Sequence, residues 1–388
     1  MFSDRFDWDL RPNALSMILQ EMRARGETIF DLTQSNPTQA GFKYDGDDIL
    51  SALSQTEAMV YEPDPHGLLK ARQAIVQYYQ ELGETIDSDL IFLTACTSEA
   101  YSVIFKLLGD PGDKILVPKP GYPLIPYLAR FESLNPLSYP LRYDNAKGWS
   151  IDMDVLESLI TPRCRAIVVV NPNNPTGNYL KPQGLAAIDK ICYDNGLALI
   201  VDEVFSDYPV SGVRQENLTV ANRTHALTFV FNGFSKILGL PQVKLGWIVV
   251  GGDSGLAETS QRHLEILLDF YLSVSTPVQH AAARLLRHRR EIQHQILARI
   301  DGNNRFLQEQ IGMTSNYSLL RWEGGWYGII EFFDAVSDEE RILQLLEHDH
   351  TLVHPGFFYE FEKEGIVVVS LLTPVETFRT GICRLISQ

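Results

Sequence analysis

Arg165-Ala-Ile-Val-Val-Val-Asn-Pro-Asn-Asn-Pro-Thr-Gly177 is the stretch that decides the fold. Its first six residues are an expected strand, in which Ala166 to Val170 form an apolar run, and the rest contains two Asn-Pro pairs and a glycine, which are typical of a rigid turn. Similar apolar runs occur at Leu90 to Leu93, Lys114 to Val117, Leu197 to Val201, Leu227 to Phe231 and Leu245 to Val250. Runs of this kind are typical of parallel strands that are buried on both faces of a sheet.

Helical patterns lie between these runs, at Ser98 to Leu108, Met153 to Ile160 and Pro182 to Asn195. Alternating strands and helices predict an α/β domain. After Gly252 the pattern is helical to about residue 301, and strands are expected near Tyr327 to Phe333 and Ile366 to Leu371. We expect this last part to form a smaller α+β domain.

The composition favours a soluble globular protein with small-molecule ligands. Of 388 residues, 45% are hydrophobic and 21% are charged, and 33 Lys and Arg against 49 Asp and Glu give a net charge of −16. This charge argues against nucleic acid or a membrane surface as the partner. The N-terminus is acidic, unlike a secretion signal, and no apolar run is long enough to span a bilayer. We expect a cytoplasmic protein.

The cysteines and histidines do not predict a metal site. The four cysteines form no CxxC pair, and they match neither zinc-ligand spacing nor a disulfide framework. His348 and His350 lie on an acidic stretch without a convincing ligand set, and we interpret them as surface residues.

Polar residues follow four of the expected strands, where ligands bind in open α/β sheets. Thr94-Ala-Cys-Thr-Ser-Glu99 opens a helix, whose N-terminus suits a phosphate. The alternative is an ordinary helix cap made by Thr97 or Ser98. The turn after Val170 holds the Asn174 amide in place, either for a ligand or for the turn itself.

Two ionisable residues follow the next expected strands. Asp202 either caps a loop or pairs with a buried cation. Lys236 lies between two apolar segments, which indicates a partly buried ammonium group. Burial lowers the pKa of a lysine and makes it a usable nucleophile for Schiff-base chemistry, although a lone lysine is more often a solvated surface charge.

With these segments in order, the chain resembles the class I/II aminotransferases, the fold-type I enzymes that use pyridoxal 5′-phosphate (PLP). The resemblance rests on Asn174-Pro-Thr-Gly177, Asp202-Glu-Val204 and Gly233-Phe-Ser-Lys236, and it covers almost the whole chain from Leu32-Thr-Gln-Ser-Asn-Pro37 onward. It implies a large domain, residues 46–300, with a mainly parallel seven-stranded sheet between helices. Residues 1–45 would join residues 301–388 in the small α+β domain.

The resemblance also implies roles for the site residues. Lys236 would form the Schiff base with PLP and move the proton, Asp202 would keep the pyridine nitrogen protonated, and Asn174 would donate to the ring oxygen. The other cofactor-binding residues would be Ala95, Cys96, Thr97, Tyr122, Phe205, Ser235, Lys244 and Tyr61. Tyr61 would reach the phosphate from the neighbouring subunit, which implies a homodimer with shared active sites.

Three positions of the cofactor site depart from the family pattern. Phe205 stands where many relatives carry a tyrosine that donates to the ring oxygen. Lys244 replaces an arginine that grips the phosphate, and a lysine gives less geometric control than a bidentate arginine. Cys96 replaces a common glycine, and we interpret its side chain as a small buried apolar group.

The substrate site departs further. Val368 fills the slot of the arginine for the substrate carboxylate, so either another cation, such as Arg321, Arg379 or Arg384, binds that group, or the substrate is not an ordinary α-amino acid. Arg379 and Arg384 are otherwise expected on a solvated helix face. Tyr271 stands where dicarboxylate-specific relatives have a second arginine.

We therefore expect PLP-dependent transfer of an amino group from an amino acid to a 2-oxo acid. We do not expect the enzyme to be specialised for dicarboxylic amino acids. A PLP-dependent β-lyase or decarboxylase is the first alternative, because those enzymes share the Schiff base. A non-catalytic PLP-binding or ligand-binding protein is the second, since several slots are altered. The presence of both Lys236 and Asp202 favours an enzyme.

Overall fold

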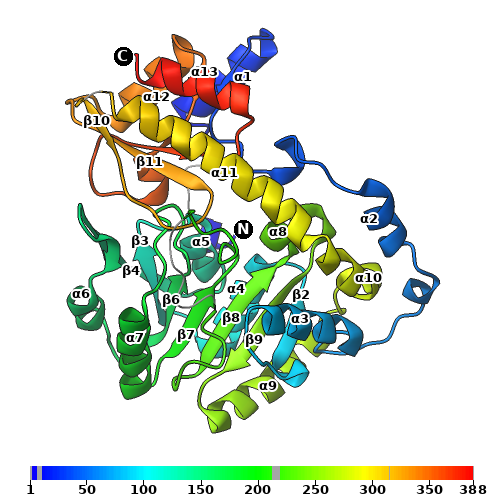
Figure 1. The fold of residues 1–388 in the computed structure, drawn as a ribbon. Coiled ribbons are helices and arrows are strands. Elements are labelled where there is room, and N and C mark those ends of the chain that lie inside the picture. The colour runs from blue at the N-terminus through cyan, green and yellow to red at the C-terminus, as the bar shows by residue number, and fades with distance from the viewer. Residues whose placement is uncertain (1, 7–10, 212–218, 314, 388) are drawn as a thin grey trace.

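The computed structural model describes residues 2–6, 11–211, 219–313 and 315–387, and its main feature is an eight-stranded sheet (Figure 1). The strand order is β2-β9-β8-β7-β6-β3-β4-β5. The strands are β2 (Ile91–Thr94), β3 (Lys114–Lys119), β4 (Asn135–Asp144), β5 (Gly148–Ile151), β6 (Cys164–Val170), β7 (Ala198–Asp202), β8 (Thr228–Gly233) and β9 (Gly246–Gly251).

The sheet is mainly parallel, as expected, but it has eight strands and not seven. Strands β4, β3, β6, β7 and β8 run parallel to one another, while β9 is antiparallel to both β8 and β2. The additional strand arises because β5 turns back on β4 in an antiparallel pair and extends the sheet at that edge.

Helices cover both faces of the sheet because neighbouring strand residues point to opposite faces. On β6, Ile167 and Val169 join one apolar cluster, and Val168 and Val170 join the other. The first cluster includes side chains of α2 (Gly46–Leu53), α3 (Leu69–Glu81), α6 (Met153–Ser158), α7 (Pro182–Asn195) and α10 (Thr276–Arg287). The second includes side chains of α4 (Thr97–Leu108), α5 (Leu124–Phe131) and α9 (Ser254–Asp269).

The smaller domain is built around an antiparallel sheet of order β10-β11-β14-β13. Its strands are β10 (Tyr317–Leu319), β11 (Tyr327–Phe332), β13 (His354–Pro355) and β14 (Ile366–Ser370), and its helices are α1 (Ala14–Ala24), α11 (Arg289–Ile311), α12 (Asp338–Glu347) and α13 (Val375–Leu385). Strand β1 (Phe30–Asp31) pairs in parallel with β12 (Thr351–Leu352), so a segment near the start of the chain is part of this domain.

Short helices complete the described chain: η1 (Asp4–Phe6), η2 (Pro37–Gln39), η3 (Thr56–Met59), η4 (Ser88–Leu90), α8 (Phe234–Ile237), η5 (Pro241–Val243) and η6 (Gly356–Tyr359). The region expected to be helical after Gly252 consists of α9, α10 and α11, and α11 continues to Ile311, past the domain boundary expected near residue 300. Across the described ranges, no helix combines the length and the apolar character needed to cross a membrane.

Candidate active site

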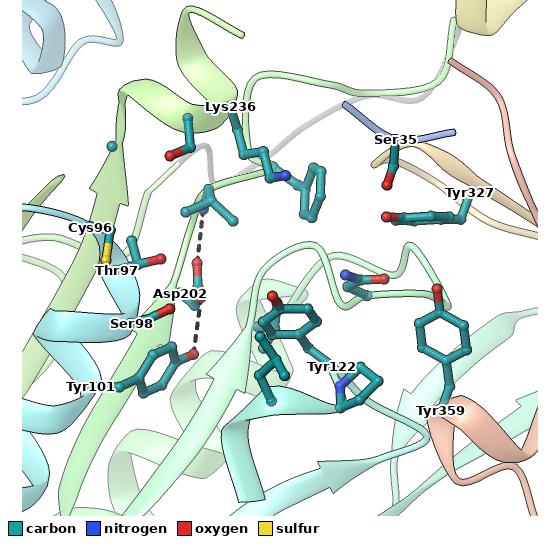
Figure 2. Close-up of a pocket in the computed structure, with 18 of the residues that line it drawn as sticks. Ser35, Cys96, Thr97, Ser98, Tyr101, Tyr122, Asp202, Lys236, Tyr327 and Tyr359 are labelled. Carbon is teal, nitrogen blue, oxygen red and sulfur yellow. Dashed lines mark hydrogen bonds between the residues drawn. The ribbon is translucent and has the colours of Figure 1, made fainter. Parts of the chain in front are cut away.

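A cavity of about 390 Å³ lies between the large sheet and the small domain (Figure 2). On the large-domain side it is lined by residues that follow parallel strands, and on the other side by Ser35 and by residues of β11, β13 and η6. Eight of the residues expected at the cofactor site line it: Cys96, Thr97, Tyr122, Asn174, Asp202, Phe205, Ser235 and Lys236. Residues from distant parts of the sequence therefore meet where the expected strands end.

Asp202 is the last residue of β7, and its carboxylate is buried beneath the cavity. The Tyr101 hydroxyl donates to Oδ2 at 3.0 Å, and the Val204 N–H donates to Oδ1 at 3.1 Å. Burial raises the pKa of Asp202 to about 6, although these two hydrogen bonds and the Lys236 charge act in the opposite direction. The carboxylate is therefore mostly ionised near neutral pH.

Lys236 lies on α8, directly after β8, and extends its ammonium group into the cavity (Figure 2). Its Nζ lies 4.8 Å from the ring centroid of Trp326 and 5.3 Å from that of Phe205. Burial lowers the pKa of Lys236 to about 8, against the opposing effect of Asp202. The side chain thus supplies a substantial fraction of neutral amine at slightly alkaline pH.

The N-terminus of α4 opens into the same cavity. Cys96 occupies the N-cap position but makes no side-chain cap hydrogen bond, so the cap by Thr97 or Ser98 that was the alternative is wrong. Cys96, Thr97 and Ser98 line the cavity together with Ser235 of α8. Free N–H groups at the start of a helix, together with nearby hydroxyl groups, fit a phosphate.

The turn after β6 presents Asn174 to the cavity. Its Oδ1 is buried without a hydrogen-bond partner among the described residues, so this oxygen can accept a hydrogen bond from a ligand. Gly177 closes this turn with φ of 68°, and a Cβ there would lie 2.5 Å from the carbonyl oxygen of Gly324. Tyr122 lines the same cavity, and burial raises its pKa to about 12, which keeps its hydroxyl protonated.

Three residues of the expected cofactor set do not line the cavity. The Ala95 N–H donates to the Glu99 carboxylate. Lys244 is exposed beside the cavity residue Leu245. Tyr61 is 50% exposed on the surface, where its hydroxyl lies 3.4 Å from the backbone nitrogen of Ser273.

The small domain forms a second wall of the cavity, which the sequence pattern did not predict. Ser35, Tyr327, His354, Phe358 and Tyr359 line this wall, and Tyr101 supports Asp202 from below. These six residues come from five separate segments, so no local spacing identifies them. The available signals were that Ser35 lies in the Leu32 to Pro37 segment of the family resemblance and that Tyr327 opens a strand expected in the C-terminal part.

The structure also shows where the residues considered for substrate-carboxylate binding lie. Val368 is fully buried in the apolar cluster of the small domain. Arg321 donates to the Ala146 carbonyl and Arg384 to the Asp349 carbonyl, while the Arg379 guanidinium lies 5.4 Å from the Phe306 ring. None of these residues lines the cavity, and no arginine does so among residues 2–6, 11–211, 219–313 and 315–387.

The structure is thus an α/β fold in which a buried carboxylate, a lysine and a helix N-terminus that suits a phosphate line one cavity. The family model described as aminotransferase class I and II matches residues 28–377, and the chain belongs to this family. It is an aminotransferase, its cofactor is PLP, and it transfers an amino group between an amino acid and a 2-oxo acid.

Individual relatives are similar over most of the chain. The glutamate-pyruvate aminotransferase AlaA of Haemophilus influenzae is 26% identical over 379 residues, which cover 95% of this chain and 93% of the relative. The alanine aminotransferase of Mycobacterium bovis is 28% identical over 349 residues, or 86% and 79% of the two chains. An Escherichia coli aminotransferase structure superposes with a TM-score of 0.86 at 25% identity, covering 99% and 96% of the chains.

Proposed function

We propose that this aminotransferase uses a monocarboxylic amino acid with a small or apolar side chain, and alanine is the first donor to test. The relatives above are named for alanine or for glutamate and pyruvate. The cavity offers aromatic and aliphatic side chains, including Leu124, Val204 and Phe358. A second carboxylate would find no arginine among the described residues of the lining, which disfavours a dicarboxylate specialist.

The amino-transfer chemistry in this proposal rests on one observation. Lys236 and Asp202 lie in one cavity, close enough that each shifts the pKa of the other. We assign Lys236 Nζ to hold the cofactor aldehyde and to carry the proton during transfer. The Asp202 carboxylate holds a proton on the ring nitrogen, and PLP, when bound, supplies an acceptor for the electron pair released at the substrate α carbon. Asn174 binds the ring oxygen and Tyr122 packs against the ring.

The phosphate end of the site is completed by a second subunit in this proposal. The backbone around Cys96 and the hydroxyls of Thr97 and Ser235 hold the phosphate from one chain, with Lys244 as a nearby charge and Ala95 in the same loop. Tyr61 is half exposed and does not line the cavity of its own chain, and in this proposal it acts from the partner in a homodimer. We also propose cytoplasmic residence and domain bounds of 46–300, with 1–45 joining 301–388.

Exposed apolar side chains support the dimer. Met59 and Val60 precede Tyr61 on one loop, and Phe270 and Leu272 lie on another; all four are more than half exposed. The two loops meet where the Ser273 hydroxyl contacts the backbone of Asp64. An exposed apolar patch of this kind is typical of a protein interface.

The test is the visible spectrum of the purified protein, before and after borohydride, followed by addition of amino acids. We expect a yellow protein whose colour borohydride fixes at Lys236, as peptide mapping would show, and conversion to the pyridoxamine form by alanine. Lys236→Ala should abolish amino exchange. Pyruvate and ammonia formed without any 2-oxo acid acceptor would instead identify a β-lyase, and a protein that stays colourless with added PLP would contradict the proposal.

A further inference from the structure

The wall of the cavity opposite Lys236 carries hydroxyl and imidazole groups where a carboxylate-binding arginine would be expected. We propose that this chain binds the substrate carboxylate through neutral hydrogen-bond donors of His354, Tyr359 and Tyr327. This inference rests on the proposed function and goes beyond it, since it names the groups that recognise the substrate.

Strand register supports this location. Val368 on β14 lies directly opposite His354 on β13 and Ile329 on β11, and Ser370 lies opposite Tyr327. Residues that are directly opposite, and residues two apart on one strand, point to the same face of a sheet. The face that holds the buried Val368 therefore also presents His354 and Tyr327, and both of these line the cavity.

The hydrogen-bond count shows that donors remain available. His354 Nδ1 lies 3.1 Å from the Tyr359 hydroxyl oxygen. A neutral imidazole has one N–H and a phenol has one O–H, and their mutual bond uses only one of these two hydrogens. Whichever tautomer is present, the pair keeps one donor for a ligand.

A second pair of hydroxyls lies beside the first. Ser35 and Tyr327 have neighbouring hydroxyls at the cavity wall (Figure 2), and Ser35 lowers the pKa of Tyr327 against the larger effect of burial. The rings of Tyr327 and Tyr359 are 6.3 Å apart, so both pairs belong to one cluster. With one free donor each, the two pairs match the two oxygens of a carboxylate.

The charge state of the cluster favours neutral donors. Burial lowers the pKa of His354 below its usual 6.5, and Asp31 is the group that opposes this effect. The Asp31 Oδ1 already accepts hydrogen bonds from the backbone and hydroxyl of Thr33, at 2.8 and 2.6 Å. Burial also raises the pKa of Tyr359, so its phenol stays protonated.

These groups select the class of substrate. Neutral donors bind a single carboxylate through hydrogen bonds alone, without the positive charge that a guanidinium group would supply. The cavity residues Phe358 and Leu124 suit a small or apolar substrate side chain. The substrate class is therefore monocarboxylic α-amino acids, and amines without a carboxylate should bind less tightly.

The experiment compares the binding of two amines that cannot be transaminated, using the PLP-loaded protein. 2-Methylalanine carries the carboxylate, and tert-butylamine replaces that group with a methyl; neither has an α hydrogen to transfer. The dissociation constant of each is measured from the change in the visible band, and the ratio of the two constants reports on carboxylate recognition. The variants are His354→Leu, His354→Gln and Tyr359→Phe, with His348→Leu as control because His348 is exposed in the same domain.

We expect the wild-type protein and the control to prefer 2-methylalanine. The ratio should fall about tenfold in at least one of His354→Leu and Tyr359→Phe, namely the variant that removes the donor facing the carboxylate, because a hydrogen bond to a charged group is lost. His354→Gln should recover part of any loss seen in His354→Leu. Should His354→Leu fail to bind PLP, His354→Gln and Tyr359→Phe decide together.

The outcomes separate this inference from the proposed function. An unchanged ratio in Tyr359→Phe and in each His354 variant that binds PLP, or no wild-type preference for 2-methylalanine, would overturn the inference even if alanine is transaminated normally. A ratio that falls as expected in a protein that transfers no amino group would leave the carboxylate site in place and refute the proposed function.

Discussion

The Tyr101 hydroxyl donates a 3.0 Å hydrogen bond to the Asp202 carboxylate, and both side chains are buried. This bond lowers the pKa of Asp202 while desolvation raises it to about 6. Tyr101 is therefore a positioning residue that helps to keep the carboxylate ionised.

Tyr101→Phe should raise the pKa of Asp202, because a donor to the charged form is lost. The acid limb of the kcat profile should move to higher pH, and kcat at neutral pH should fall about tenfold, in line with a hydrogen bond to a charged group. Steady-state kinetics across pH measure both effects. Tyr139→Phe is the matched control, since the buried Tyr139 hydroxyl donates to the Val168 carbonyl; an equal shift of its acid limb would contradict the prediction.

Phe205→Tyr should lower the pH at which the visible band of the PLP-loaded protein titrates. The Phe205 ring lines the cavity 5.3 Å from Lys236 Nζ, and a phenol there adds a donor that stabilises the negative ring oxygen. A spectrophotometric titration of both proteins measures the shift. A variant that titrates at the same or a higher pH would refute this explanation of the departure at Phe205.

Recombination of the apoprotein with PLP should become faster as pH rises through about 8 and then level off. Burial lowers the pKa of Lys236 to that value, and only the neutral amine attacks an aldehyde. The linked stability change has a definite sign. Between about pH 8 and 10.5 the folded apoprotein binds fewer protons at Lys236 than the unfolded chain, so this group adds stability as pH rises. Rapid-mixing absorbance measures the rate of recombination at each pH. A midpoint of the rate–pH curve near pH 10 would contradict the prediction for Lys236.

Tyr61→Phe should weaken PLP binding about tenfold, because a hydrogen bond to the phosphate is lost across the subunit interface. The loss should appear at protein concentrations where the wild type is dimeric, as equilibrium dialysis beside analytical ultracentrifugation would show. Tyr193→Phe is the control, since Tyr193 is 61% exposed on α7. Equal PLP affinity in the two variants would count against the shared site.

Gly177→Ala should destabilise the protein more than Gly196→Ala. Both glycines have left-handed φ angles, 68° and 63°, and that conformation costs about 1–2 kcal/mol for other residues. A Cβ at Gly177 would also lie 2.5 Å from the Gly324 carbonyl oxygen, whereas nothing lies within 4 Å at Gly196. Urea unfolding measures the difference, and equal losses would show that the turn relaxes around the new methyl group.

The central strands and the position of Asp202 and Lys236 at the ends of two of them could be predicted because their signals are local. The helix predicted at Pro182 to Asn195 has the same bounds as α7. Both bounds have local signals, because a proline begins the helix and Gly196 ends it in a left-handed conformation. Strand β4 was missed because Pro136 and Pro140 interrupt its apolar pattern, and with it the hairpin that adds the eighth strand.

The remainder of the site could not be predicted because it depends on tertiary structure. Ser35 and His354 meet at the cavity only after β1 pairs with β12. The Leu32 to Pro37 segment contributes to the family resemblance, but it does not mark Ser35 as a residue of the site, and nothing next to His354 in the sequence does so for that residue. The same holds for Tyr101, whose spacing on α4 is that of an ordinary core residue. The roles assigned to Asn174, Lys244 and Tyr61 stay predictions until the experiments above are done.

The pairing of β1 with β12 also bears on the order of folding. The large sheet uses residues 91–251, so it can form while the small domain still lacks its last strands. The cavity, in contrast, needs Ser35 from near the start of the chain and Tyr359 from near its end, a sequence separation that makes closure slow. Capture of PLP in a stable, coloured form should therefore be a late event in biosynthesis, and the colour of a refolding sample would report on completion of the whole chain.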